Sequence, residues 1–179
     1  MSVILAATAL ANGATGNFSP QHVNNWTIEI VGVIAGGDPL SLSLSRGFMP
    51  TVGVDEVQIP FGNESVYVAG RARYEGGTLE IRDYVDQDIQ GLVRNWFERV
   101  YSGIASMTNG RVGVPADYKR NAFILLSAPD GSVERKWRLR GLWPMQWNPG
   151  GLDMSSSEQV NLSVACRYDK AVYEGQSAA

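Results

Sequence analysis

The chain has 179 residues, an apolar share of 44%, a charged share of 18% and a formal net charge of −3. This composition is typical of one folded domain and excludes wholesale disorder. The small negative charge argues against a strongly basic surface for tight nucleic-acid binding, and the single Cys166 excludes an internal disulfide and a multi-cysteine metal site.

The first residues combine an apolar run with small residues, as a signal peptide does. However, no Lys or Arg occurs before Arg46, so the positively charged start of such a peptide is missing. We therefore expect residues 1–17 to form a flexible arm. Nowhere does the sequence approach the ~20 consecutive apolar residues of a membrane span, and no membrane insertion by this chain is expected.

Alternation of apolar and other residues predicts strands in the first half of the chain. The run around Trp26, Ile28 and Ile30 is followed by a Gly-Gly-Asp-Pro turn, by the alternating residues 40–45, and by a second extended run over residues 51–59. The apolar phase of that run shifts at Asp55 and Glu56, which predicts a bulge. Residues 46–51 are expected to be the tip between the two runs, 60–64 a loop and 78–84 a short strand.

Only one segment has the period of an amphipathic helix, from Ile89 to Ile104. We expect Asp86 to be its N-cap, with Asp88 adding a charge that suits the positive end of the helix dipole. The helix should pack on the sheet through four apolar side chains: Leu92, Trp96, Phe97 and Val100.

Strands return over residues 122–128, 133–143 and 160–168. In the middle run, alternation places Trp137, Leu139, Gly141 and Trp143 on the face opposite Lys136, Arg138 and Arg140. The polar residues 171–179 are expected to be a mobile tail. The prediction is a single mainly β domain over residues 18–170, an antiparallel sandwich or barrel with one packed α-helix.

Candidate catalytic groups are scarce. His22 is the only histidine, which removes His-pair metal sites. Asp86 and Asp88 could ligate Mg²⁺ but fit helix capping better, and the glycine pairs match no phosphate-binding motif. Interleaved arginines and tryptophans over 135–143 could bind nucleic acid or a glycan by stacking, but alternation puts them on opposite faces. We expect no enzyme activity, no cofactor and no metal.

The order of these segments resembles the tail tube family of contractile-tailed bacteriophages over residues 18–170. The residues that carry the resemblance are the Ile-Pro-Phe-Gly-Asn loop (59–63), the Thr-Leu-Glu-Ile-Arg-Asp strand (78–83), the helix with Trp96-Phe97 and Val100-Tyr101, and the Gly-Leu-Trp-Pro (141–144) and Leu-Asp-Met-Ser (152–155) segments before the last strand.

This resemblance implies hexameric rings that stack into a hollow tube for DNA ejection, inside a contractile sheath. The partners would be further copies of the chain, the tail sheath protein, baseplate and tail-terminator proteins, and DNA sliding through the lumen without sequence-specific binding. The protein would be a virion tail component assembled in the host cytoplasm. Type VI secretion and R-type pyocin inner tubes have the same fold and stay open as alternatives, as does a monomeric carbohydrate-binding β-sandwich, a different class suggested by five tryptophans.

Two sets of residues are expected to serve the tube. Assembly contacts are assigned to residues of the extended pair and of the arginine strand: Leu40, Leu42, Leu44, Gly47, Phe48, Met49, Pro50, Arg138 and Arg140. The small side chains of Ser41, Ser43 and Ser45 are expected to line the lumen, although this face could instead meet the helix while the leucines contact neighbours.

Overall fold

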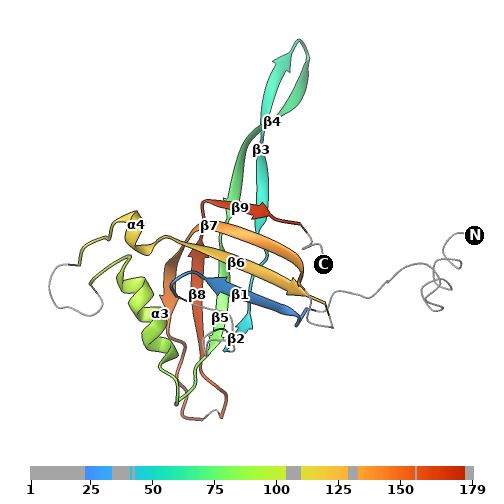
Figure 1. The fold of residues 1–179 in the computed structure, drawn as a ribbon. Helices are drawn as coiled ribbons and strands as arrows, with labels where there is room; N and C mark the ends of the chain where they lie inside the picture. The colour runs from blue at the N-terminus through green and yellow to red at the C-terminus, as the bar shows by residue number, and fades with distance from the viewer. Residues whose placement is uncertain are drawn as a thin grey trace, which may run out of the picture.

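Every strand pair in the described part of the chain is antiparallel. The computed structural model describes residues 23–33, 41, 43–103, 110–128, 133–155 and 157–175. Its elements, shown in Figure 1, are β1 (Trp26–Ile30), β2 (Leu44–Arg46), β3 (Thr51–Phe61), β4 (Glu64–Glu75), β5 (Gly77–Arg82), α3 (Ile89–Glu98), α4 (Pro115–Tyr118), β6 (Arg120–Ser127), β7 (Val133–Asn148), β8 (Asn161–Arg167) and β9 (Lys170–Tyr173).

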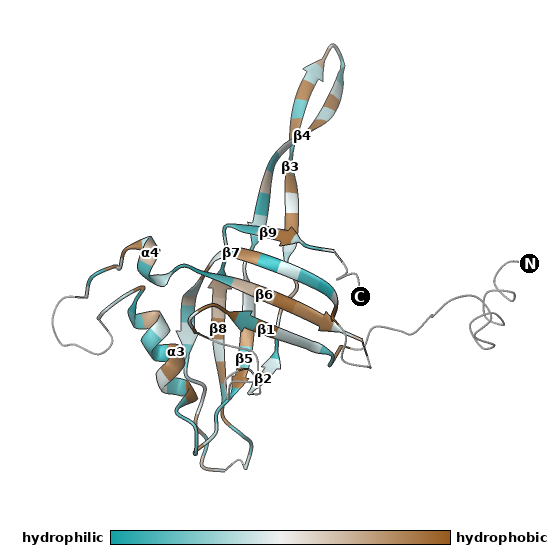
Figure 2. Ribbon diagram, in the orientation of Figure 1, coloured by the Kyte–Doolittle hydropathy of each residue, from teal (hydrophilic) through white to brown (hydrophobic). Residues whose placement is uncertain are grey.

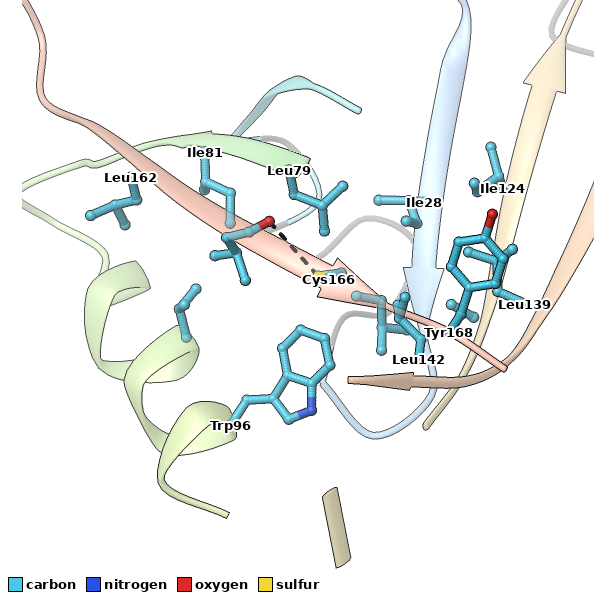
Figure 3. Packing of buried hydrophobic residues seen from close by; sticks show 14 of the residues in the cluster. Ile28, Leu79, Ile81, Trp96, Ile124, Leu139, Leu142, Leu162, Cys166 and Tyr168 are labelled. Carbon is cyan, nitrogen blue, oxygen red and sulfur yellow. Dashed lines mark hydrogen bonds between the residues drawn. The ribbon is translucent and has the colours of Figure 1, made fainter. Parts of the chain in front are cut away.

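Seven strands form one sheet in the order β1-β6-β7-β8-β5-β2, with β9 also pairing with β7. Among the residues that the structure describes, the strands β3 and β4 pair only with each other, as a separate hairpin. The helix α3 packs against the sheet beside β8 (Figure 3). The mainly β, antiparallel fold with one packed helix, expected from the sequence, is therefore confirmed.

The long strand β7 joins the two parts of the sheet. Its first half pairs with β6 and β9, and its second half pairs with β8. Between the halves, Arg120 pairs with Leu142 while Ala122 pairs with Leu139, and Gly141 has a φ of 67°. An extra residue in one strand makes a β-bulge, and a glycine tolerates this φ without strain.

Because of this bulge, the face predicted for the residues of β7 after Gly141 is wrong. Leu139 and Leu142 are both fully buried, although strict alternation would place them on opposite faces. Side chains therefore alternate regularly between the two faces of the strand only up to Gly141. Beyond the bulge, Trp143 no longer lies on the same face as Leu139. Its ring instead packs at 5.7 Å from the ring of Tyr118.

The core lies between the sheet and α3. Aliphatic side chains from β1, β5, β6, β7 and β8 fill it together with Ile89, Val93 and Trp96 of the helix (Figure 3). Trp96 is 4% exposed, and its indole N–H donates a hydrogen bond to the carbonyl oxygen of Tyr118 at 3.2 Å. Large apolar side chains that are removed from water in this way supply most of a domain's stability.

Three details of the predicted helix are wrong. The helix ends at Glu98 rather than near Ile104, so Val100 lies beyond it and is only half-buried, as is Phe97. Leu92 is 47% exposed, because the buried stripe runs through Ile89, Val93 and Trp96 and leaves Leu92 at its edge.

The N-cap is also different from the one expected. The Asp88 carboxylate accepts a hydrogen bond from the backbone N–H of Gly91 at 2.9 Å, so Asp88 rather than Asp86 caps α3. A Cβ on Gly91 would lie only 2.1 Å from an Asp88 carboxylate oxygen. The glycine therefore leaves the space that the capping side chain occupies.

In the described residues, the strand pair expected from residue 40 to Ile59 does not form. Of the part of the alternating run that is described, only Leu44–Arg46 is a strand, and it pairs with β5 rather than with β3. Leu40 and Leu42 lie outside the described residues. Within the described part of the chain, β2 pairs only with the outer edge of β5, and the register between them shifts after Leu44. The alternating pattern therefore predicted an extended apolar segment here, but it did not predict the strand with which this segment pairs.

The partner of β3 is β4, which the sequence prediction missed. The turn at Gly62 and Asn63 joins them, so residues 60–64 form the tip and residues 46–51 do not. The register does shift between Val54 and Glu56, at the predicted place, but Gly70 and Arg71 of β4 both lie opposite Asp55, so the extra residue is in β4 and not in the predicted run. Strand β4 lies outside the body and buries neither face completely, which explains its weak alternation.

The mobile tail was predicted to begin at residue 171, which is too early. Residues 170–173 form β9, which pairs with β7. The ring of Tyr173 packs 5.0 Å from that of Trp137, and the Glu174 carboxylate lies 2.6 Å from the Arg138 guanidinium. These contacts hold β9 on the edge of the sheet.

The two faces of α3 can be separated by matched substitutions. Trp96→Asp should lower the free energy of unfolding by about 3–5 kcal/mol, because it leaves a cavity and buries an unpaired charge. Leu92→Asp adds the same charge at an exposed position and should cost under about 1 kcal/mol. Urea unfolding of the unassembled protein, followed by circular dichroism, measures both. Similar losses in the two variants would refute this orientation of the helix.

Candidate assembly surface

The hairpin of β3 and β4 is the most exposed feature of the molecule. It projects away from the body (Figure 1), and the pairing continues from Thr51 opposite Glu75 to Phe61 opposite Glu64. Nearly all its residues are exposed, and many are apolar (Figure 2). Phe61 at the tip has 75% of its surface exposed. Among these exposed apolar residues are Val52, Val54, Val57, Ile59, Phe61, Val66, Tyr67 and Val68.

The apolar side chains of the hairpin form two sets. Near the tip, Val57 pairs with Val68 and Ile59 with Val66, whereas near the base Val52 pairs with Tyr74. Residues that are an odd number of positions apart point to opposite faces of a strand. The apolar side chains therefore change face between Val54 and Val57, at the bulge.

The ribbon is also twisted, since the two strands exchange places between base and tip (Figure 1). The hairpin thus exposes apolar side chains both near its base and near its tip.

The base of the hairpin is fixed by Tyr168. Its hydroxyl accepts from the Thr51 N–H at 3.1 Å and donates to the Thr51 carbonyl oxygen at 3.3 Å. Its ring stacks on Phe48 and lies 6.0 Å from that of Tyr74. The Tyr168 phenol is protonated at neutral pH even at its ordinary pKa, and burial raises that pKa further, so the hydroxyl remains a donor. The body therefore orients the hairpin while leaving its surface free.

An apolar groove lies beside this base, with a volume of about 550 Å³. Trp26 of β1, Leu126 of β6 and the segment from Arg46 to Met49 line it, and we call it the Trp26 groove. Gly47 lies so close to the Trp26 ring that an added Cβ would come within 2.7 Å of it. The groove is therefore shaped by a glycine that lets the chain pass directly over the indole.

The proposed assembly residues fall in different surroundings. Gly47, Phe48 and Met49 line the Trp26 groove, and Met49 is exposed. Leu44 is half-buried against the core, and Pro50 is half-buried next to the hairpin base.

The two arginines of β7 differ from each other. Arg138 is engaged within the chain, because its guanidinium pairs with Glu174 and lies 5.3 Å from the centre of the Phe123 ring. Arg140 is exposed. The Arg138 side chain is only 39% exposed and is held between Glu174 and Phe123, so Arg140 is the better candidate for a subunit contact.

The three serines do not share one strand face, as the lumen assignment required. Ser43 is 1% exposed and its carbonyl oxygen accepts from the Arg82 N–H. Ser41 is half-buried, whereas Ser45 is exposed and donates its hydroxyl to the Glu80 carbonyl oxygen at 3.1 Å. The alternation that suggested a lumen face is thus interrupted by a turn at Ser43.

The described residues offer little for catalysis. No group of three or more His, Cys, Asp or Glu residues among them could hold a metal ion, and His22 lies outside them. Asp88 is used as the helix cap. Cys166 is buried, and burial raises the pKa of its thiol to about 12, so the reactive thiolate is scarce at neutral pH. None of the described helices has the length and apolar character needed to cross a membrane.

The architecture is that of the tube proteins of contractile tails and injection systems. The chain is similar to the tail tube protein of Serratia phage KSP90, with 24% identity over 161 residues that cover 88% of this chain and 89% of the relative. No family model matches the sequence.

Solved structures show the same fold. A chain in the cryo-EM structure of the PVC sheath–tube complex, from an extracellular contractile injection system in the extended state, superposes with a TM-score of 0.62 at 13% identity over 89% of this chain and 94% of that one. A chain in the cap that terminates the tube of the anti-feeding prophage gives 0.63 at 13% identity, over 93% and 99%. The resemblance inferred from the sequence is thereby confirmed.

The capping role of Asp88 can be tested against a metal-binding role. Asp88→Ala should lower the free energy of unfolding by about 1 kcal/mol, whereas Asp88→Ser keeps an N-cap acceptor and should change it much less. Thermal unfolding with and without added Mg²⁺ measures both effects. Stabilisation of the parent by Mg²⁺ that both variants lose would point to a ligand role instead.

Proposed function

We propose that the protein is a structural subunit of a bacteriophage contractile tail tube, which works by self-assembly. The exposed hairpin carries this proposal. An isolated two-stranded hairpin is marginally stable in water, and large exposed apolar patches mark interaction sites. The fold and the phage relative support the same function.

In this proposal six copies form a ring, and rings stack into a hollow conduit. The strands left unpaired at the edges of each subunit acquire partners in the ring, which removes the hazard of open edges. The segment from Gly47 to Pro50, with Leu44, and the exposed Arg140 remain proposed contacts between subunits. Leu40 and Leu42 also remain proposed contacts from the sequence alone.

The conduit carries DNA during ejection, and a contractile sheath surrounds it. The net charge of −3 favours this role, because a weakly acidic subunit does not hold the phosphate backbone tightly. Baseplate and terminator proteins contact the two ends of the tube, and the subunits assemble in the host cytoplasm. The protein acts without catalysis. The phage relative favours a tail tube over a secretion or pyocin tube.

Removing the outer half of the hairpin tests the proposal. A variant without residues 57–68, with Glu56 joined to Ala69 through Asn-Gly, should keep the folded body, because none of the deleted residues belongs to the core or packs against it, and Tyr74, which does pack against it, is kept. It should fail to form tubes that the parent forms. Sedimentation and negative-stain microscopy report assembly, and circular dichroism reports folding.

The control is Leu152→Ser, which removes an exposed apolar side chain outside the hairpin. It should assemble like the parent. Tubes of normal length from the shortened variant would contradict the role given to the hairpin, and a parent that stays monomeric at high concentration would contradict the proposed function itself.

A further inference from the structure

We infer that the tip of the hairpin in one copy docks in the Trp26 groove of the next copy along the tube. This inference rests on the proposed function, and it assigns the receiving surface. The occupant of the groove is thus a second copy of this chain. The contact is heterologous, since each copy offers a tip and receives one, and such contacts build open stacks.

The apolar character of the two surfaces matches. Phe61 and Val66 project at the tip with more than half of their surfaces exposed. The groove is lined mainly by apolar side chains, among them Trp26, Met49 and Leu126. Aromatic side chains that enter apolar pockets typically dominate the binding energy of an interface. Docking would remove both surfaces from water.

The charges beside the two surfaces are complementary. Glu64 lies directly opposite Phe61 in the hairpin register, so it accompanies the tip. Arg46 lines the groove, and 73% of its side chain is exposed even though it contacts Glu80 at 2.9 Å. A carboxylate arriving with the tip therefore meets a guanidinium at the groove, which favours this register over others.

The positions of tip and groove suit a repeating stack. The groove includes Met49, just before β3 begins at Thr51, and the tip lies at the other end of the same strand. At ~3.3 Å per residue, eleven residues of strand span about 36 Å. A copy displaced by this length along the hairpin brings its groove to the tip of the first copy. The tip of each hairpin would then lie at the base of the hairpin in the next copy.

Engineered cysteines test the contact directly. Phe61→Cys and Met49→Cys, combined in one chain, lie at opposite ends of β3 and cannot form a disulfide with each other, because bridged Cα atoms must lie within about 7 Å. After oxidation of assembled tubes with diamide, we expect a ladder of disulfide-linked multimers on non-reducing gels. Either single variant should give at most scattered dimers. Phe61→Cys combined with Leu152→Cys is the matched control and should give no ladder.

The outcomes separate the inference from the proposed function. Tubes of the double-cysteine variant without a ladder would overturn the inference and leave the proposed function standing. A disulfide between Met49→Cys and a cysteine placed in residues 1–22 of the same chain, formed in place of the ladder, would assign the groove to that segment and also overturn it. A parent that forms no tubes would overturn both.

A charge exchange gives an independent readout. Arg46→Glu and Glu64→Arg should each raise the critical concentration for tube formation about tenfold, which corresponds to about 1.4 kcal/mol per contact. The double variant should restore it toward the parent value, whereas Asp86→Arg, an exposed charge inversion elsewhere, should leave it unchanged. Failure of the double variant to recover would contradict the pairing of Arg46 with Glu64.

Discussion

The bend of β7 at Gly141 is the constraint on which the rest of the body depends. A single strand of sixteen residues serves both parts of the sheet, pairing first with β6 and β9 and then with β8. The bulge at Gly141 lets the strand turn and still direct Leu139 and Leu142 into the core. Without that change of phase, one of the two leucines would point away from the core.

The end of β8 connects the core to the hairpin. Cys166 is buried in the core, and two residues later Tyr168 holds the backbone of Thr51, where β3 begins. The core and the projecting hairpin are therefore linked through a few contacts at one point. This separation suits a subunit that folds by burying one set of apolar residues and assembles by burying another.

Sequence patterns predicted those parts of the fold in which one face is buried by the chain itself. The strands at Trp26, Thr78 and Leu162 and the amphipathic helix were visible, because burial on one face imposes a period. Of the four helix contacts that were predicted, however, only Trp96 is buried. The phase shift at Asp55 also predicted the place of a bulge, although the extra residue lies in β4. Patterns failed at β2, where alternation did not reveal which edge the segment pairs with, and at β4, which the body does not bury.

The assembly surface was only partly predictable for the same reason. The segment from Gly47 to Met49 was singled out as a tip, yet it lines a groove whose other wall comes from β1 and β6, far away in the sequence. A local sequence pattern does not reveal that two segments so far apart in the sequence form the walls of one groove. The lumen assignment of Ser43 failed because a turn buries it, which residue type and spacing alone do not reveal.

The hairpin must also avoid pairing too early with other chains. The unpaired edges of β3 and β4 could pair with any open strand, but several features oppose this. Pro60 removes a backbone donor near the tip, the bulge disrupts the edge, and Asp55 pairs with Arg73 at 2.8 Å beside that bulge. Charges, prolines and bulges are the means by which exposed strands resist unspecific association. The bulge and the Asp55–Arg73 pair lie away from the apolar tip side chains Ile59, Phe61 and Val66, so the edges of the hairpin are protected there while its tip stays free for one specific contact.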